Sequence, residues 1–257
     1  LTNASFKDDI ADVIANARSA GISSMVITGT SELSSKEALA LAQQWGLFCT
    51  AGIHPHDAKD ASTGFVANLK QLTESPQVVA IGECGLDFNR NYSPKNEQLD
   101  VFEQQLELAM ETSLPVFLHE RDAFKEQLVL LSKYQTPDSI YISHCFTGGV
   151  SQMMGYLDLG CYIGITGWLC DERRGQDLRE AVAELPLDRL LLETDAPYLL
   201  PRNYRPRPKR SRNLPQYLPH IAQEVANIKA ITVEEVANAA WENTIKAFKL
   251  ELQSNTV

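Results

Sequence analysis

The chain lacks the features of a membrane, secreted or disulfide-stabilised protein. No apolar run reaches the roughly 18 residues that a membrane span needs, and no basic segment precedes a short apolar one near the start. The five cysteines are odd in number, scattered and without a CxxC pair, which argues against a disulfide frame or a zinc finger. We therefore expect a monomeric cytoplasmic protein with reduced thiols and no membrane partner.

Positive charge is also scarce. The chain has 23 Lys and Arg against 33 Asp and Glu, a net charge of −10, and such a balance disfavours polyanionic partners. Residues 202–212 are the exception, because they hold six basic side chains and no acidic one: Arg202, Arg205, Arg207, Lys209, Arg210 and Arg212. This segment is either a solvated surface loop or a basic edge that receives a phosphate-bearing substrate.

Apolar segments of strand length, by contrast, are frequent and alternate with helical patterns. Their nearly continuous apolar character is typical of a parallel sheet that is covered on both faces. The expected strands are Ser24–Thr30, Leu47–Ile53, Val78–Gly82, Pro115–His119, Ile140–His144, Cys161–Ile165 and Leu190–Thr194. Apolar faces predict helices around 6–17, 102–110 and 178–185, and later at 218–226 and 233–248. Thr232 and Glu235 have the spacing of a capping box on the last one.

Five of these strands run into a potential metal ligand at or just past their carboxyl end. The ligand candidates are His54 and His56, Glu83 with Asp87 close behind, His119, His144, and Asp195. Parallel α/β barrels keep their chemistry at that end, whereas a doubly wound sheet places its ligand at one switch point. We therefore predict an α/β fold of the (β/α)8 TIM-barrel type, as a single domain over 1–257. Because seven strands are visible, we expect the first barrel strand to lie before residue 1.

Glu83, His119, His144 and Asp195 form a mixed carboxylate and imidazole set. Such ligands suit divalent Mg²⁺, Mn²⁺ or Zn²⁺. Each histidine taken alone is more simply explained as a hydrogen-bonded core or surface residue, but their shared place on the strands weighs against that. Cys84 and Cys145 directly follow two of these residues, and strand alternation predicts that both turn to the opposite face and pack there.

Two further groups have open alternatives. His54-Pro55-His56 is either a metal-binding pair or a loop pair that contacts substrate. Arg121 and the basic segment 202–212 are candidates to neutralise phosphate oxygens. Arg173 and Arg174 are candidates as well, with surface salt bridges as the alternative.

Six blocks of the sequence resemble the signature blocks of the TatD family of metal-dependent deoxyribonucleases. They span most of the chain in the family order: GIHPH (52–56), IGECGLDF (81–88), LHERDAF (118–124), SHCFTG (143–148), GITGWLCDERRG (164–175) and LLLETDAPYLLPR (191–202). The resemblance implies an amidohydrolase-like TIM barrel in which another metal motif lies on strand one, before residue 1.

The resemblance also implies roles for individual residues. Glu83, His119, His144 and Asp195 match the family's metal positions, and Asp195 with Glu83 would be catalytic, Asp195 by orienting or deprotonating the attacking water. Substrate contacts would come from the following residues: His54, His56, Arg121, Arg205 and Arg207. The implied enzyme is a 3′-5′ exonuclease on single-stranded DNA or RNA, with one or two divalent ions. Mg²⁺ is expected first, and Mn²⁺ or Zn²⁺ are the alternatives.

Two other functions compete with this one. The first is an amidohydrolase that cleaves a C–N bond or a small phosphoester; some of those enzymes use a carboxylated Lys as the strand-four ligand, where this chain has Glu83. The second is a non-catalytic module that binds nucleic acid or protein, against which the intact ligand set argues. Both features favour the nuclease.

Overall fold

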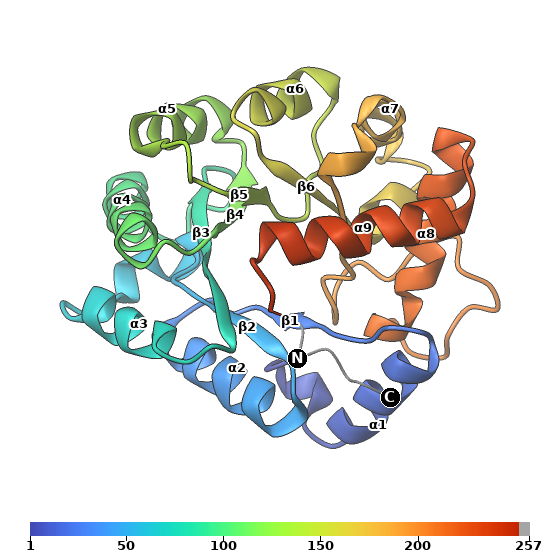
Figure 1. The fold of residues 1–257 in the computed structure, drawn as a ribbon, viewed down its shortest axis with the longest axis horizontal. Helices are drawn as coiled ribbons and strands as arrows, with labels where there is room; N and C mark the ends of the chain where they lie inside the picture. Colours follow the sequence, from blue (N-terminus) through green and yellow to red (C-terminus); the bar gives the residue numbers. More distant parts are fainter. Residues whose placement is uncertain (252–257) are drawn as a thin grey trace.

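The computed structural model describes residues 1–251, which contain one parallel sheet whose seven strands pair in sequence order. Figure 1 shows the sheet curled, with helices around its outside. The strands are β1 (Val26–Ile27), β2 (Phe48–Ala51), β3 (Val78–Asp87), β4 (Val116–Arg121), β5 (Tyr141–Ser143), β6 (Tyr162–Ile165) and β7 (Leu190–Leu192). All seven lie where the apolar segments predicted strands. A further strand before residue 1 stays a prediction.

Most of the helices lie around the outside of the sheet (Figure 1). The helices are α1 (Ile10–Ser19), α2 (Glu32–Trp45), α3 (Phe65–Thr73), α4 (Lys95–Thr112), α5 (Phe124–Tyr134), α6 (Val150–Asp158), α7 (Gln176–Glu184), α8 (Leu218–Lys229) and α9 (Val233–Ala247). Helices α2 to α7 each connect two successive strands. Short 3-10 turns are η1 (Ala4–Phe6), η2 (Pro55–Asp60), η3 (Gly167–Cys170), η4 (Leu187–Arg189) and η5 (Pro215–Tyr217). The predicted capping box is present at α9, where the Thr232 hydroxyl accepts from the Glu235 amide at 3.2 Å. No helix within residues 1–251 is long and apolar enough to cross a bilayer.

Strand β3 is longer than the sequence predicted, because it continues through five more residues to Asp87. The second half of the strand is polar and so does not continue the apolar segment in the sequence, although all ten residues of the strand are buried. Between Gly82 and Cys84 the pairing with β4 advances by only one residue, so Glu83 is the extra residue of a β-bulge. The Glu83 amide donates instead to the carbonyl of Gly29 at 2.7 Å. The bulge therefore sets the direction of the Glu83 side chain.

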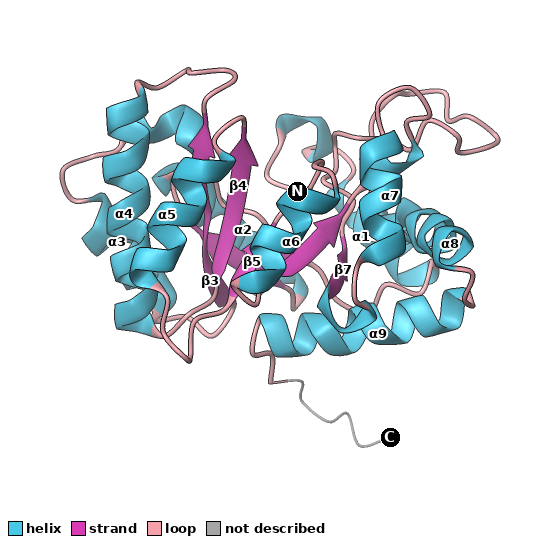
Figure 2. Ribbon diagram, turned by 90° about the horizontal axis from the view of Figure 1, so that it is seen from above, coloured by secondary structure: helices cyan, strands magenta, loops and turns pink. Residues whose placement is uncertain are grey.

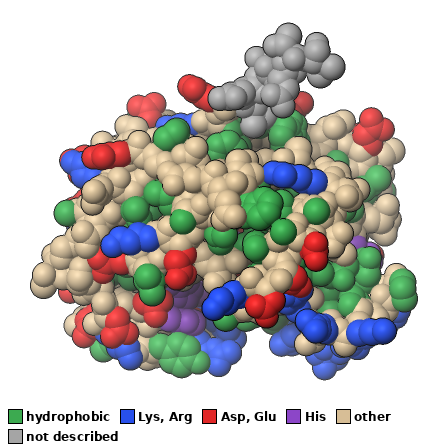
Figure 3. Space-filling view, turned by 90° about the horizontal axis from the view of Figure 1, so that it is seen from below, with side chains coloured by type: hydrophobic (Ala, Val, Ile, Leu, Met, Phe, Trp, Pro, Cys, Tyr) green, Lys and Arg blue, Asp and Glu red, His purple; other side chains and the backbone are tan. Residues whose placement is uncertain are grey.

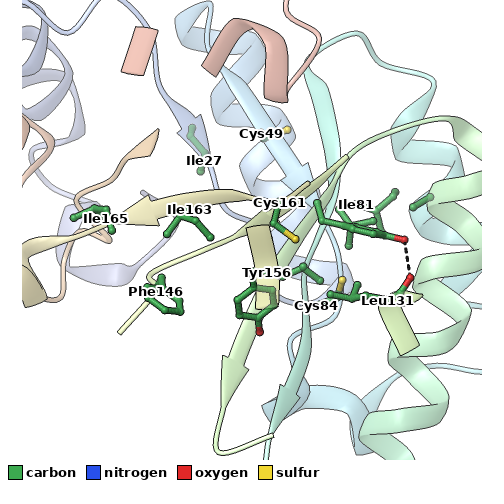
Figure 4. Close-up of a cluster of buried hydrophobic side chains, with 14 of the residues drawn as sticks. Ile27, Cys49, Ile81, Cys84, Leu131, Phe146, Tyr156, Cys161, Ile163 and Ile165 are labelled. Atoms are coloured by element: carbon green, nitrogen blue, oxygen red, sulfur yellow. Dashed lines mark hydrogen bonds between the residues drawn. The ribbon is translucent and has the colours of Figure 1, made fainter. Parts of the chain in front are cut away.

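The main core lies between the sheet and the helices. Figure 4 shows Ile81 of β3, Ile163 of β6 and Cys161, which directly precedes β6, packed near Tyr156 of α6. Cys84 is fully buried in the same cluster, as predicted. Burial raises the pKa of the Cys161 thiol to about 12, which is typical of a cysteine that serves packing.

A second apolar cluster fills the inside of the curled sheet at the amino ends of the strands. The chain supplies Phe248 and Leu250 to it directly after α9, and they pack against side chains from β3 to β7: Val79, Ala80, Phe117, Ile142, Tyr162 and Leu191. Figure 2 shows α9 lying across this end of the sheet. The Phe248 and Phe117 rings have centroids 6.0 Å apart. The interior is therefore a packed core and not a channel.

The long segment after β7 has no helix or strand until η5, as the proline-rich sequence predicted. Arg212 fixes it to the start of the chain: its guanidinium donates to both carboxylate oxygens of Asp9, at 3.0 and 2.5 Å, and to the carbonyl of Ser5. It also lies 5.0 Å from the centre of the Phe6 ring. Arg212 therefore has a structural role, because it holds this segment against the start of the chain.

Candidate metal centre

The carboxylate of Glu83 lies at the centre of a cluster formed by the carboxyl ends of several strands. Its Oε1 atom is 2.9 Å from Nδ1 of His119, 3.4 Å from Nε2 of His54 and 3.9 Å from Nε2 of His144. These histidines follow or belong to β2, β4 and β5, so three elements converge on one buried oxygen. The structure thus brings together residues that the sequence placed at separate strand ends.

A second buried carboxylate, Asp87, ends β3. Its Oδ2 is 2.6 Å from Nε2 of His56 and 3.5 Å from Nε2 of His119. Its Oδ1 accepts from the amides of Asn89 and Arg90. Asp87 was a ligand candidate from its place close behind Glu83, but it was not part of the predicted metal set of Glu83, His119, His144 and Asp195. The spacing of four residues from Glu83 could have indicated that Asp87 faces the same site, because residues four apart in a strand lie on one face.

The histidine pair of the HPH motif lies within this cluster. The Nδ1 atom of His54 accepts a 3.1 Å hydrogen bond from the amide of His56, which leaves Nε2 of His54 facing Glu83. One nitrogen from each of His54, His56 and His119 lies within 4.8 Å of the other two. This spacing suits three ligands of one ion and favours the metal-binding interpretation of the motif.

The hydrogen bonding of the two ring nitrogens of His119 indicates whether the cluster suits a bound cation. Its Nδ1 is hydrogen-bonded to Glu83 at 2.9 Å, and its Nε2 faces the Asp87 carboxylate at 3.5 Å. Within residues 1–251 this buried Nε2 has no hydrogen-bond partner. A buried polar atom without a partner is costly, and a divalent cation would satisfy both the nitrogen and the carboxylate. The donor set of imidazole nitrogens and carboxylate oxygens fits such an ion.

His144 is held by a residue that sequence reasoning missed. Oε2 of Glu193 accepts from Nδ1 of His144 at 2.6 Å and from the Cys145 amide at 3.0 Å. The His144 Nε2 atom then faces Glu83 and lies 3.7 Å from Oδ1 of Asp195. The spacing of Glu193 and Asp195, two residues apart after β7, was an available indication of a shared face.

Gly164 on β6 provides the space that Glu193 occupies. A Cβ atom at this position would lie 2.1 Å from Oε1 of Glu193, far inside van der Waals contact. The neighbouring strand therefore requires a residue without a side chain at this point.

Asp195 differs from the other carboxylates of the cluster. It has a left-handed backbone, with φ of 53°, and its side chain is 31% exposed. Burial raises the pKa of Asp195 to about 6, against the opposing effect of the His144 charge. Its carboxylate is thus mostly ionised at neutral pH yet close to the range where it exchanges protons, as a general base requires.

The carboxylates of the cluster raise the pKa values of two of the histidines. Burial alone would lower the pKa of His119, but the neighbouring carboxylates of Asp87 and Glu83 raise it to about 9. Burial likewise opposes the charging of His144, but the charges of Glu193 and Glu83 raise the pKa of His144 to about 10. The cluster as a whole therefore stabilises positive charge, whether it comes from protons or from a metal ion.

Cys145 does not lie where the sequence predicted. Its φ of 46° breaks the strand alternation, so the side chain does not turn into the core as that of Cys84 does. Its sulfur is half-buried, 3.5 Å from the Thr166 hydroxyl, and burial and the charge of Asp195 raise the pKa of the thiol far above its usual value. The expectation of an opposite-face packing residue is wrong for Cys145, because the left-handed residue ends the period-two pattern.

The arginines predicted to contact substrate lie outside the cluster. Arg121 is exposed at the end of β4, paired in register with Asp87. Arg205 is exposed and donates to the carbonyls of Arg202 and Tyr204 of its own loop. Arg207 is exposed without an ion pair within residues 1–251. Figure 3 shows Lys and Arg side chains gathered along an edge where histidine also reaches the surface.

Residues 1–249 match the model of a protein family described as TatD related DNase. The chain belongs to this family. Among relatives, the 3′-5′ ssDNA/RNA exonuclease TatD of Erwinia amylovora is 53% identical over 239 residues, which cover 92% of each chain. The protein of the same name from Erwinia tasmaniensis is 50% identical over 252 residues, 97% of each chain. The predicted family and nuclease function are therefore confirmed.

Solved structures confirm the barrel fold of this TatD-family chain. A TatD homologue from Escherichia coli K12 superposes with a TM-score of 0.88 at 28% identity, covering 97% of this chain and 95% of the other. A TatD-family hydrolase from Entamoeba histolytica gives 0.84 at 26% identity, covering 94% and 89%. An uncharacterised amidohydrolase from Saccharomyces cerevisiae shares the fold, with a TM-score of 0.84 at 21% identity and coverage of 93% and 92%. Family, fold and the histidine–carboxylate cluster together indicate divalent-metal binding.

Proposed function

We propose that this nuclease removes nucleotides from the 3′ end of single-stranded DNA or RNA by divalent-metal-dependent hydrolysis. The observation that carries the proposal is the convergence of His54, His119 and His144 on the buried carboxylate of Glu83. The names of the relatives from Erwinia support the polarity and the substrate.

The metal would be held by the predicted residues together with the HPH pair. Glu83 and Asp195 supply oxygen, and the histidines supply nitrogen: His54, His56, His119 and His144. The sequence made Mg²⁺ the first expectation. The imidazole-rich set now favours Mn²⁺ or Zn²⁺, since Mg²⁺ prefers oxygen ligands and keeps several waters.

The side chains have distinct roles in the proposed reaction. A bound divalent ion lowers the pKa of water and neutralises charge on the phosphate. Asp195 accepts a proton from the attacking water at a carboxylate oxygen, because its pKa of about 6 leaves it ionised at neutral pH. Glu193 keeps the His144 ring in one orientation through the Nδ1 hydrogen bond. Arg121 lies at the same end of the sheet and supplies positive charge for the phosphate oxygens.

The packed interior supports action at an end of the strand. Phe117, Ile142 and Phe248 fill the inside of the sheet, so a nucleic-acid strand has no path through it. A strand terminus reaches a site at the barrel mouth without threading.

The test uses 3′-labelled and 5′-labelled single-stranded oligonucleotides and a covalently closed single-stranded circle. We expect stepwise shortening from the 3′ end that EDTA abolishes and Mn²⁺, Zn²⁺ or Mg²⁺ restores to different extents. The circle should resist. A His119→Ala preparation, purified identically, controls for contaminating nuclease. Hydrolysis that continues in EDTA, or at the wild-type rate in His119→Ala, would refute the proposal.

A further inference from the structure

Three arginines surround one buried carboxylate near the carboxyl end of β6. Asp171 directly follows η3 and is 2% exposed. Its carboxylate oxygens lie 2.8 Å from Nη2 of Arg174, 3.4 Å from Nε of Arg173 and 3.8 Å from Nε of Arg202. The amide of Arg173 also donates to Oδ1 of Asp171 at 3.1 Å. We call Arg173, Arg174 and Arg202 the arginine cluster.

The arginine cluster lies beside the candidate metal centre. η3 begins after Thr166, whose hydroxyl is 3.5 Å from the sulfur of Cys145, the residue next to His144. Arg202 belongs to the loop that follows β7 and contains Asp195. These two loops pack closely, because a Cβ on Gly167 of η3 would lie 2.1 Å from the carbonyl of Leu199.

The charges in this cluster do not balance. One carboxylate faces three guanidinium groups, which leaves a surplus of positive charge in a chain whose net charge is −10. Glu172 lies in the same turn but makes no ion pair with the cluster within the described residues. The side chains are 62%, 55% and 49% exposed for Arg173, Arg174 and Arg202. A contact that served only to fix the loop would need one arginine, as in the pair of Arg179 with Glu224.

The cluster is also held in place before any ligand arrives. The Arg174 guanidinium lies 4.3 Å above the centre of the Trp168 ring, a cation–π contact. Asp171 holds one edge of each guanidinium, and the remaining N–H groups are available to solvent. A planar guanidinium with free N–H groups matches the oxygens of a phosphate.

We propose that Arg173, Arg174 and Arg202 form a subsite for backbone phosphates of a single-stranded nucleic acid, next to the metal centre. The inference rests on the proposed function and extends it to the part of the strand that is not being hydrolysed. Asp171 is a positioning residue in this subsite, because it acts through the arginines. The hydrolysed bond lies at the metal centre, and the cluster binds phosphates at neighbouring nucleotides.

The experiment measures binding separately from hydrolysis. Fluorescence anisotropy of a labelled single-stranded decamer in EDTA gives Kd over a range of salt concentrations for wild type, Arg202→Gln and Arg174→Gln/Arg202→Gln. Arg189→Gln is the matched control, because Arg189 lies in η4 before β7, at the opposite end of the strands. Arg202 is the most distant partner of Asp171, so its single variant carries the least risk to folding.

We expect loss of Arg202 alone to weaken decamer binding about tenfold, since one charged hydrogen bond is worth roughly that factor, and the double variant to weaken it about a hundredfold. The slope of log affinity against log salt should become shallower by about 0.7 for each phosphate that the variant no longer neutralises. Arg202→Lys should retain the salt slope because it retains the charge. Arg189→Gln should match wild type.

Hydrolysis assays then distinguish the two proposals. Metal-dependent hydrolysis of a dinucleotide, whose single phosphodiester is the bond that is hydrolysed, should be equal in wild type and the variants, while KM for the decamer rises without a change in kcat. Decamer affinity and salt slope unchanged in both arginine variants would overturn the phosphate subsite and leave the nuclease proposal intact. Failure of wild type to hydrolyse either substrate would refute the nuclease proposal, while the anisotropy result would still decide the subsite.

Discussion

Oε2 of Glu193 accepts a 2.6 Å hydrogen bond from Nδ1 of His144. This contact fixes both the tautomer and the rotation of the imidazole, so Nε2 faces Glu83 and Asp195. Carboxylates behind metal-bound histidines commonly tune metal affinity in this way. Glu193 therefore influences the centre through His144.

Glu193→Gln should weaken metal binding about 10- to 100-fold, the usual effect of losing such a carboxylate partner. Activity should recover in part at high Mn²⁺, because the ligands themselves remain. Titration of activity with Mn²⁺ measures the shift, and circular dichroism checks the fold. Glu242→Gln on α9, where the side chain is 67% exposed, is the control. Equal metal affinity in the two variants would contradict the role of Glu193.

Gly164→Ala should reproduce the metal dependence of Glu193→Gln without touching a ligand. The new methyl group would overlap Oε1 of Glu193, and the flexible carboxylate would move away from His144. Melting temperature should change little, since the carboxylate and not the backbone gives way. Gly64→Ala is the control, because the nearest atom to its Cβ would be 4.0 Å away. Wild-type Mn²⁺ dependence in Gly164→Ala would exclude this mechanism.

Metal binding at pH 7 should release protons. The pKa of His119 is raised to about 9 and that of His144 to about 10, so both rings hold protons until a metal displaces them. Metal affinity should therefore rise as pH increases toward 9. Calorimetric titration in two buffers with different ionisation enthalpies counts the protons. The same heat in both buffers would show that no proton is released.

The stability of the metal-free protein should depend on pH in the opposite direction to metal affinity. Both histidines have a folded pKa above their unfolded value of about 6.5. Their contribution to the free energy of unfolding is fully present below pH 6.5 and is lost as pH rises through 9 to 10. Urea titrations in EDTA should show these two groups contributing less stability at pH 9 than at pH 6.

Phe248→Ala should lower the free energy of unfolding by about 3 kcal/mol or more, as for other buried phenylalanines. The Phe248 ring fills the inside of the sheet beside Phe117, and removing it would leave a cavity. Urea unfolding measures the loss. Trp241→Ala on α9, where this residue is 40% exposed, should lower the free energy of unfolding by less. An equal loss for the two variants would show that the interior position of Phe248 is unimportant.

The sequence predicted the order of the strands and the end of the sheet that carries the site. Continuous apolar segments mark buried parallel strands, and a polar residue after each one is visible without a structure. The length of β3 was not predictable in this way, because its second half is buried yet polar. Glu83 was expected at the end of a strand and lies inside one.

Contacts between distant residues account for what the sequence did not reveal. The partners of His56 and His144 lie 31 and 49 residues away, at Asp87 and Glu193. The basic segment 202–212 is one run in the sequence, but its members have different roles in space. Arg212 binds Asp9, and Arg202 faces Asp171. The number of charged residues along a segment does not predict which distant side chains they contact.

The extra residue at Glu83 makes the centre sensitive to the length of β3. Gly82 pairs with Phe117 and Cys84 pairs with Leu118, so deleting the extra residue between them would leave a regular ladder with both faces of the strand unchanged. Cys84 would stay in the core, and the centre would lose the carboxylate that the histidines surround. Variation among related enzymes should therefore occur in substitutions and loop lengths, whereas the count of residues from Val78 to Asp87 should stay fixed.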